Sequence, residues 1–419
     1  MGKKENFNST IYTCYLSSIV MAVVCNFPPL LFLFLRETYG FSFGAMGALV
    51  SVNFVTQVAT DVLFSKVVDK YGYRPFIILG ECMCALGFLV FASTPWIFAG
   101  MEYTGLVIGT ILFSIGAGLQ ELLLSPIMDA LPTENKEKAM SLMHSFYAWG
   151  QVLAVALSTI LLMVLGSEKW PFIMLGWMVL PITSATLFCF VPLRQRVSAE
   201  KAMKIRELLC MPLFLFALVA ISCGGASEVT ICQWTSSFME GALDMPKVWG
   251  DILGMSGFAV MMGLGRMLYG LYGERFDLHK LLVAGSVGAT VLYVIAALTN
   301  SGGIAVIACC LIGFCVSLLW PGTLSVAAGM LPMAGASMFA LAAAGGDLGC
   351  AIGPWFAGIV TDWAAANVQI AGFTAQQVGL RAGILSGTIF PAVSLVFQLL
   401  LWRACRKKSI EKAASGRKA

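Results

Sequence analysis

The chain has 419 residues, of which 59% are hydrophobic and 11% are charged. Soluble globular proteins carry about a quarter charged residues, so this composition excludes an ordinary soluble domain. Apolar runs of about 18 residues or more recur along the chain, which predicts a polytopic helical protein with the lipid bilayer as its partner. The formal net charge of +4 comes from basic loops and tails, and we expect no nucleic-acid binding.

Twelve membrane-spanning helices are expected, and most of their connections are short, so neighbouring helices should be antiparallel. The predicted spans are 12–35, 43–64, 75–95, 104–131, 140–166, 171–193, 211–238, 250–273, 281–299, 304–331, 337–363 and 381–402. The longest connection divides the chain into an N-terminal six-helix bundle (1–193), a linker (194–210) and a C-terminal six-helix bundle (211–419). The fold class is therefore an all-α membrane protein with two related bundles.

The basic residues predict the orientation of this bundle in the membrane. With the N-terminus inside, 22 of the 26 Lys and Arg residues lie in inside loops or tails, leaving Arg36, Lys169, Lys247 and Arg381 outside. Basic residues favour cytoplasmic loops. We therefore expect a plasma-membrane protein, working as a monomer, with both termini in the cytoplasm.

Thirteen Cys and two His residues give little support to a metal or cofactor site. Pairs such as Cys82/Cys84 and Cys309/Cys310 fit neither a redox nor a zinc spacing. The two His residues supply neither a metal-ligand set nor a nucleophile–base pair. We expect no cofactor, no metal and no enzymatic activity.

Four irregular points occupy corresponding places in the two halves. The first span contains Asn26-Phe27-Pro28-Pro29 and the seventh contains Gly224-Gly225, while the fourth contains Pro126 and the tenth contains Trp320-Pro321-Gly322. Interrupted helices at matching positions indicate a central binding site. The alternative is the ordinary tolerance of membrane helices for Gly and Pro.

Glu121 lies near the middle of the fourth predicted span, in the stretch GAGLQELLLSP. A carboxylate at that depth costs several kcal/mol, so a chain that retains one is expected to use it. Burial favours the neutral form, which would let Glu121 bind and release a proton and so couple transport to the proton gradient. If it stays ionised, it could hold a cationic substrate, and the structural alternative is a Glu that bonds to a neighbouring helix.

Further polar and aromatic residues are candidates for the same central site. Asn53, Gln57 and Asp61 are spaced i, i+4, i+8 and share one helix face, although Asp61, near the inner end, fits a gate better. Amides suit a hydroxyl-rich solute, since each both donates and accepts hydrogen bonds. The remaining candidates for substrate or proton binding are Asn26, His144, Tyr147, Gln151, Glu228, Gln233, Trp234, Trp320 and Asp347.

Each of these candidates has a structural alternative. The amide face could instead join helices. Trp234 fits an interfacial aromatic belt as well as a substrate platform, whereas Trp320, nearer mid-membrane, is expected to face the cavity. Asp347, after Gly345-Gly346, fits an ion pair across the cavity or a hydrogen-bonded Asp on a tightly packed helix.

The loop Ser65-Lys66-Val67-Val68-Asp69-Lys70-Tyr71-Gly72-Tyr73-Arg74 resembles the G-x-L-A-D-R-x-G-R-K signature of the major facilitator superfamily, with Ser in the first Gly place. A second copy, Gly270-Leu271-Tyr272-Gly273-Glu274-Arg275, follows the eighth span. The resemblance implies a transporter of twelve helices that alternates access by rocking two bundles. It also implies a cytoplasmic gate, which we assign to Asp69, Arg74, Arg266, Glu274 and Arg275.

Within this superfamily the chain looks most like the fucose–proton symporter group. Glu121-Leu122-Leu123-Leu124-Ser125-Pro126 resembles that group's E-x-x-x-N-P, and Ser317-Leu318-Leu319-Trp320-Pro321 its S-x-x-x-P. Met143-His144-Ser145-Phe146 and the pair Glu228/Trp234 resemble two further segments. The acid of the group's first helix has no counterpart here, because that region reads Val24-Cys25-Asn26-Phe27.

The expected function is secondary active transport of a small polar solute, with a sugar as first choice and the proton as coupling ion. An exporter or antiporter of an amphipathic or cationic compound is the first alternative. A sensor or scaffold that does not transport is the second.

Overall fold

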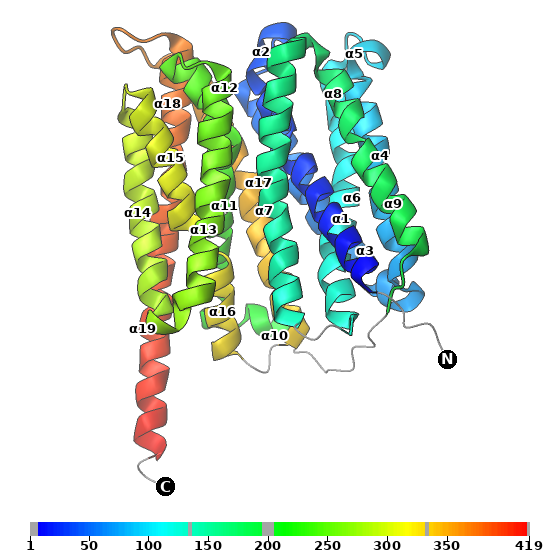
Figure 1. The fold of residues 1–419 in the computed structure, drawn as a ribbon. Coiled ribbons are helices and arrows are strands. Elements are labelled where there is room, and N and C mark those ends of the chain that lie inside the picture. The colour runs from blue at the N-terminus through cyan, green and yellow to red at the C-terminus, as the bar shows by residue number, and fades with distance from the viewer. Residues whose placement is uncertain (1–6, 133–135, 195–204, 332–334, 417–419) are drawn as a thin grey trace.

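The computed structural model describes residues 7–132, 136–194, 205–331 and 335–416, and within these ranges the regular structure is helical. Eleven segments of the described residues are long and apolar enough to span a bilayer. The Gly-rich helix α17 (Gly335–Asn367) runs through the bundle beside them and completes the twelve (Figure 1). The predicted number of spans and the all-α class are confirmed.

Six traverses form the N-terminal bundle, and two of them are built from consecutive helices. They are α1 (Asn8–Asn26) with η1 (Pro28–Leu31) and α2 (Phe32–Tyr39); α3 (Phe43–Tyr71); α4 (Tyr73–Ala92); α6 (Glu102–Ala130); α7 (Lys136–Leu165); and α8 (Trp170–Trp177) with α9 (Val179–Phe190). Two short helices lie in its connections, α5 (Thr94–Ile97) and η2 (Ser167–Lys169).

The C-terminal bundle has the same number of traverses. They are α11 (Pro212–Leu243); α12 (Lys247–Trp249) with the π-helix η3 (Gly250–Ser256) and α13 (Gly257–Tyr272); α14 (Leu278–Leu298); α15 (Gly302–Val316) with α16 (Pro321–Met330); α17; and α18 (Ala375–Gly387) with α19 (Ile389–Gly416). Two short helices, α10 (Ile205–Leu209) and η4 (Gly273–Arg275), lie in connections. Most of the predicted linker lies outside the described residues, so the exact domain boundaries stay a prediction.

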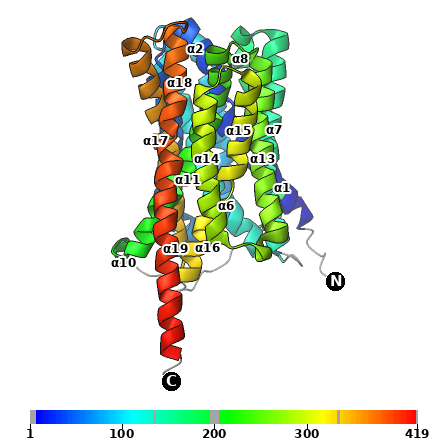
Figure 2. The ribbon, with the colours of Figure 1, turned by 90° about the vertical axis from the view of Figure 1, so that its left-hand side faces the viewer.

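Both ends of the described chain lie at the same end of the bundle, and α19 extends well beyond the other helices there (Figures 1 and 2). We call this end the terminal side and the opposite end the distal side. An even number of traverses puts both termini on one side, as the sequence predicts. Which side faces the cytoplasm stays a prediction.

Two of the four predicted helix interruptions are present. The first traverse changes to a short 3-10 helix at Pro28, and the tenth breaks between α15 and α16 ahead of Pro321. The prediction was wrong for the other two, because α11 runs unbroken through Gly224-Gly225 and α6 runs unbroken through Pro126. Gly224 and Gly225 instead allow close packing, since an added Cβ would lie 3.1 Å from Leu319 and 2.7 Å from the Gly346 carbonyl oxygen.

Small residues bring the two bundles together on the distal half of α3 and α17. A Cβ on Gly47 would lie 2.7 Å from the Pro354 carbonyl oxygen, and one on Gly358 would lie 2.5 Å from that of Phe43. Ser51 donates a 2.6 Å hydrogen bond to the Ala351 carbonyl oxygen in the same contact. Membrane helices associate through such close backbone approaches, so the distal half of this seam is tightly closed.

Gly349→Ala is expected to destabilise the fold, because a Cβ at Gly349 would overlap the Ser222 carbonyl oxygen and push α17 away from α11. Overpacking of this kind costs about 1–3 kcal/mol. The matched control is Gly263→Ala on α13, where the described structure leaves space for a Cβ and alanine favours the helix. Thermal unfolding in detergent measures both, and equal unfolding temperatures for the two variants would contradict the predicted contact.

Candidate transport site

Three carboxyl groups meet where α3, α6 and α17 face one another. Asp61, Glu121 and Asp347 each place a carboxylate oxygen within 4.8 Å of the other two. Asp347 is 2% exposed, while Asp61 and Glu121 are partly exposed. We call these residues the carboxylate cluster. Two of its members belong to the N-terminal bundle and one to the C-terminal bundle, so the cluster spans the seam between them.

The three carboxyl groups repel one another strongly when they are ionised. Two unit charges 4.8 Å apart repel by about 3.5 kcal/mol at an effective dielectric constant near 20. Asp61 Oδ1 and Asp347 Oδ2 are buried and have no hydrogen-bond partner among the described residues. The three groups are therefore stable together only when protons or another cation neutralise part of their charge.

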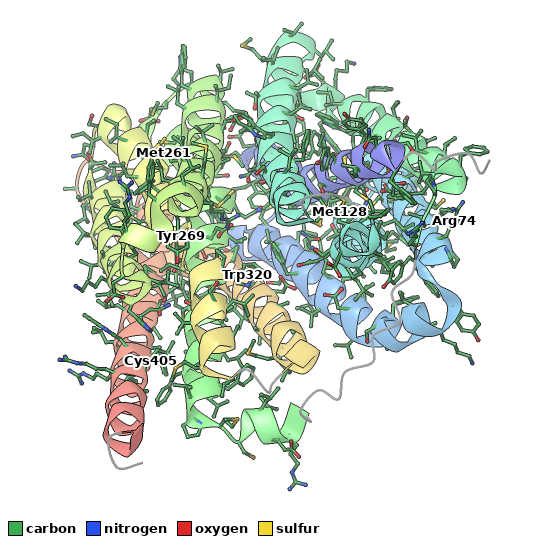
Figure 3. All side chains as sticks on the ribbon, turned by 60° about the horizontal axis from the view of Figure 1, so that its bottom comes forward. Arg74, Met128, Met261, Tyr269, Trp320 and Cys405 are labelled. Atoms are coloured by element: carbon green, nitrogen blue, oxygen red, sulfur yellow. The ribbon has the colours of Figure 1, made fainter. Side chains whose placement is uncertain are left out.

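Trp320 lies at the break between α15 and α16 and contacts α17 next to the cluster residue Asp347 in sequence. Its ring packs on Gly346, the residue before Asp347, where an added Cβ would lie 2.8 Å from the indole. The side chain is partly exposed, and seen from the terminal side it lies near the middle of the molecule, where α16 begins (Figure 3). The predicted role of Trp320 in lining a substrate cavity stays a prediction.

Glu228 on α11 already has a cationic partner. Arg266 on α13 donates from Nη2 to Glu228 Oε2 at 3.3 Å and from Nε to the Ser317 carbonyl oxygen at 3.1 Å. Ser317 caps α15 where the tenth traverse breaks, and helix C-termini leave carbonyl groups without intrahelical partners. Arg266, predicted as a gate residue, thus lies within the C-terminal bundle and balances the charge of Glu228.

The amide face of α3 is engaged in hydrogen bonds within the N-terminal bundle. Gln57 donates to Asn53 Oδ1 at 2.9 Å, and Ser114 donates to the same oxygen at 2.7 Å. Asn53 in turn lies 3.8 Å from the Cys25 thiol, which Tyr147 also contacts through a side-chain hydrogen bond. In this conformation these amides join helices, which is the alternative raised from the sequence.

A second set of amides joins the two bundles at the break in the first traverse. Gln151 lies 3.1 Å from Cys232 Sγ, and Cys232 Sγ lies 3.7 Å from Asn26 Oδ1. Gln233 donates a 3.0 Å hydrogen bond to the Cys25 carbonyl oxygen, close to where α1 ends. The small cavity lined by Cys25, Asn53, Gln233 and their neighbours is no larger than a water molecule, too small for a sugar.

Trp234 has a structural role in this conformation. It is 1% exposed, donates from Nε1 to the Pro354 carbonyl oxygen at 3.0 Å, and packs against Phe32 and Phe43. Both readings offered from the sequence, an interfacial belt and a substrate platform, require an exposed ring. The structure instead places Trp234 in the aromatic core that closes the distal side.

The predicted gate residues are only partly described. Arg74 donates to the Cys189 and Val191 carbonyl oxygens at 2.5 and 2.7 Å, so it ties α4 to the end of α9 within one bundle. Arg275 lies over the ring of Tyr272. The side chains of Asp69, Glu274 and His144 lie outside the described residues, so their assigned roles stay predictions.

Two carboxylates that the sequence analysis did not single out connect the bundles at the distal side. Asp362 on α17 accepts hydrogen bonds from the backbone N–H groups of Phe43 and Gly44, at 2.9 and 2.6 Å, and its nearest contact with Arg36 is 4.0 Å. We call this contact at the N-terminus of α3 the distal latch. An anion there is favoured by the helix dipole.

The second distal connection involves η3. Asp251 accepts a 2.8 Å hydrogen bond from Thr159 of α7 and lies 3.4 Å from Lys247 Nζ. Asp251 is fully buried. π-Helical segments are frequent at functional sites, and this one turns a C-terminal carboxylate toward the N-terminal bundle. Together with the distal latch it closes the distal side.

Sequence reasoning also assigned Asp61 to the gate and gave Glu81 no role. The i, i+8 spacing from Asn53 placed Asp61 on the helix face that contacts the other bundle's Asp347. No local sequence signal showed how close the two residues lie.

Glu81 is fully buried and accepts hydrogen bonds from Ser17 and Ser184 at 2.5 and 2.7 Å. These bonds hold α1, α4 and α9 together, so Glu81 has a structural explanation.

Comparisons with known proteins agree with this architecture. The family model described as Major Facilitator Superfamily matches residues 13–255, more than half of the chain. No curated protein matches the sequence. Among solved structures, the chain is similar to a bacterial homologue of the human lysosomal transporter Spinster in an inward-facing and occupied conformation, with 15% identity, a TM-score of 0.79, and 96% and 98% of the two chains covered.

Two proton symporters are among the other similar structures. A D-xylose–proton symporter has 14% identity, a TM-score of 0.73, and 94% and 97% of the two chains covered. The E. coli fucose–proton symporter has 19% identity, a TM-score of 0.58, and 94% and 98% covered. Identities this low show a shared fold and leave the solute open.

Proposed function

Because the chain belongs to the major facilitator superfamily of transporters, we propose that it moves a small polar solute by alternating access and couples that movement to protons. The carboxylate cluster is the observation that carries this proposal. Its members come from both bundles, so a rocking motion of the bundles changes the distance from Asp347 to Asp61 and Glu121. A change in that distance alters the repulsion among the three groups and hence their affinity for protons.

A sugar is our first choice of solute. The amides on α3, α7 and α11 can bind hydroxyl groups, although here they bond to one another and to neighbouring groups. A solute-binding conformation must therefore release some of these bonds. The xylose and fucose symporters supply a precedent for this class of solute on the same fold.

Export of a cationic or amphipathic compound in exchange for protons is the second candidate. The charge of the carboxylate cluster favours it, because Arg266 is already paired with Glu228. A cationic solute and protons would then compete for the same three carboxyl groups.

We further propose that the terminal side faces the cytoplasm and that the protein works as a monomer in the plasma membrane. The distribution of Lys and Arg supports this orientation, since 22 of 26 fall on the inside of the predicted topology. The distal side, closed in this structure, would then face outward.

Flux in proteoliposomes with a pH-sensitive dye inside tests the proposal. In a symporter, adding the transported sugar outside should carry protons inward, and an imposed inward proton gradient should drive sugar accumulation. In an exporter of cations, the same gradient should drive the cation out of the lumen. Solute movement that neither shifts the lumenal pH nor responds to the gradient would reject proton coupling.

A further inference from the structure

We propose that the transported solute carries a protonated amino group, which binds between Asp61, Glu121 and Asp347 with Trp320 as an aromatic wall. This inference rests on the proposed transport function and names the chemistry of its solute. It deepens both candidate functions, since an amino sugar and an amphipathic amine both satisfy it. The carboxylate cluster is then a ligand site as well as a proton site.

The first step is that the cluster lacks a partner. Asp347 is 2% exposed, one of its oxygens lies within 4.8 Å of carboxylate oxygens of Asp61 and Glu121, and its Oδ2 has no hydrogen-bond partner among the described residues. A buried polar atom left without a partner costs about 1–3 kcal/mol. A buried carboxylate with an unpartnered oxygen, at the contact between the bundles, therefore points to a donor that binds there during transport.

The second step is that an ammonium group matches the number and spacing of the acceptors. An –NH₃⁺ group has three N–H donors, and the cluster offers three carboxylates. With charge-assisted N···O distances of about 2.8 Å, three acceptors placed along tetrahedral directions lie about 4.6 Å apart. The three oxygens lie within 4.8 Å of one another, which accommodates that arrangement.

The third step favours an organic cation over a metal ion. Ca²⁺ takes six to eight oxygen ligands, whereas the residues of α17 next to Asp347 contact groups that are not oxygen ligands. Gly346 packs on the indole of Trp320, and the buried thiol of Cys350, one turn along α17, packs on Gly225. An aromatic face attracts an organic cation within about 6 Å of its centroid. The apolar part of an amine solute can pack on this ring.

The fourth step is the balance of charge around the cluster. Glu228 on α11 is already paired with Arg266, so this ion pair is neutral in sum. The cluster itself holds three acids contributed by α3, α6 and α17. One bound ammonium group neutralises one unit of this charge and links Asp347 to the N-terminal bundle, so it should stabilise the conformation seen here.

Thermal unfolding of the purified full-length protein at pH 7.5 tests the inference with matched probes. Glucosamine is compared with glucose, and putrescine with 1,4-butanediol, at equal ionic strength. We expect at least one amine to raise the unfolding temperature by several degrees while its neutral partner does not. Tetramethylammonium, which carries charge without N–H donors, should have a smaller effect, and Na⁺ and Ca²⁺ should have none beyond the salt control.

Variants assign the effect to this site. Asp347→Asn and Trp320→Leu should each lower the amine-induced shift, whereas Glu207→Gln, on an exposed part of α10, should keep it. Equal shifts from amines and their neutral partners, protection by Na⁺ or Ca²⁺ instead of amines, or no shift with any amine would each overturn the inference. The comparison of each amine with its neutral partner on the wild-type protein tests the inference even if a variant fails to fold.

The same samples separate this inference from proton coupling. Release of protons into weakly buffered solution on amine addition supports both. Amine binding without proton release would leave the ammonium site standing and reject coupling through the cluster. Proton-coupled flux of glucose, with no binding of glucosamine, would support proton coupling and reject the ammonium site.

Discussion

Asp362→Ala is expected to open the distal side and to expose two native cysteines to a thiol reagent. The distal latch is a contact between bundles, and the variant removes the acceptor for the N–H groups of Phe43 and Gly44. Losing charge-assisted bonds of this kind, at a partly exposed site, should cost the closed conformation about 2 kcal/mol. That corresponds to a roughly 30-fold change in the ratio of closed to open molecules.

Cys25 and Cys232 report this opening because they lie at the seam between the bundles and are 7% and 6% exposed. Their labelling rates, measured by peptide mass spectrometry, should rise by about an order of magnitude or more. The exposed Cys82 and Cys189 give internal reference rates that stay constant.

Asp277→Ala is the matched control for the latch. Asp277 also caps a helix, by accepting from the His279 N–H at 2.9 Å, but it caps α14 of its own bundle. It should therefore leave the labelling of Cys25 and Cys232 unchanged. Equal rates in Asp362→Ala and wild type would show that the latch contributes nothing to closing the distal side.

The sequence predicts the fold well because the bilayer imposes it. A span needs about 20 apolar residues, so the apolar runs predict twelve traverses, and eleven helical segments of the described residues meet this length and hydropathy. Glycine and proline were less informative. Pro28 and Pro321 start new helical segments, whereas Pro126 remains inside α6 and Gly225 serves close packing. The backbone effect of a proline depends on whether its neighbours can satisfy the freed carbonyl group.

The site was predictable only in part. Glu121 and Asp347 stand out as acids in apolar helices, and each was selected on that ground. Their meeting with Asp61 depends on how α3, α6 and α17 cross, which is a tertiary property without a local sequence signal. The distal latch was missed for the same reason, since Asp362 caps a helix that begins 319 residues earlier in the chain.

Glu121→Gln is expected to abolish concentrative uptake while leaving solute exchange partly intact. Glutamine keeps the shape and hydrogen-bonding capacity of a protonated Glu but cannot release the proton, so one coupling step is lost. The cluster would then hold two acids in place of three, and the repulsion that changes on rocking falls. Accumulation driven by a proton gradient should drop at least tenfold, and the remaining exchange should depend less on pH.

The measurement compares gradient-driven accumulation with exchange at equal pH, using a solute that moves protons in the wild-type protein. Glu207→Gln serves as the control, because this exposed carboxylate on α10 lies in the connection between the bundles. Unaltered accumulation in Glu121→Gln would remove Glu121 from the coupling mechanism and leave Asp61 and Asp347 as the protonated pair. Loss of both accumulation and exchange would instead show that Asp61 and Asp347 cannot hold the solute without the charge of Glu121.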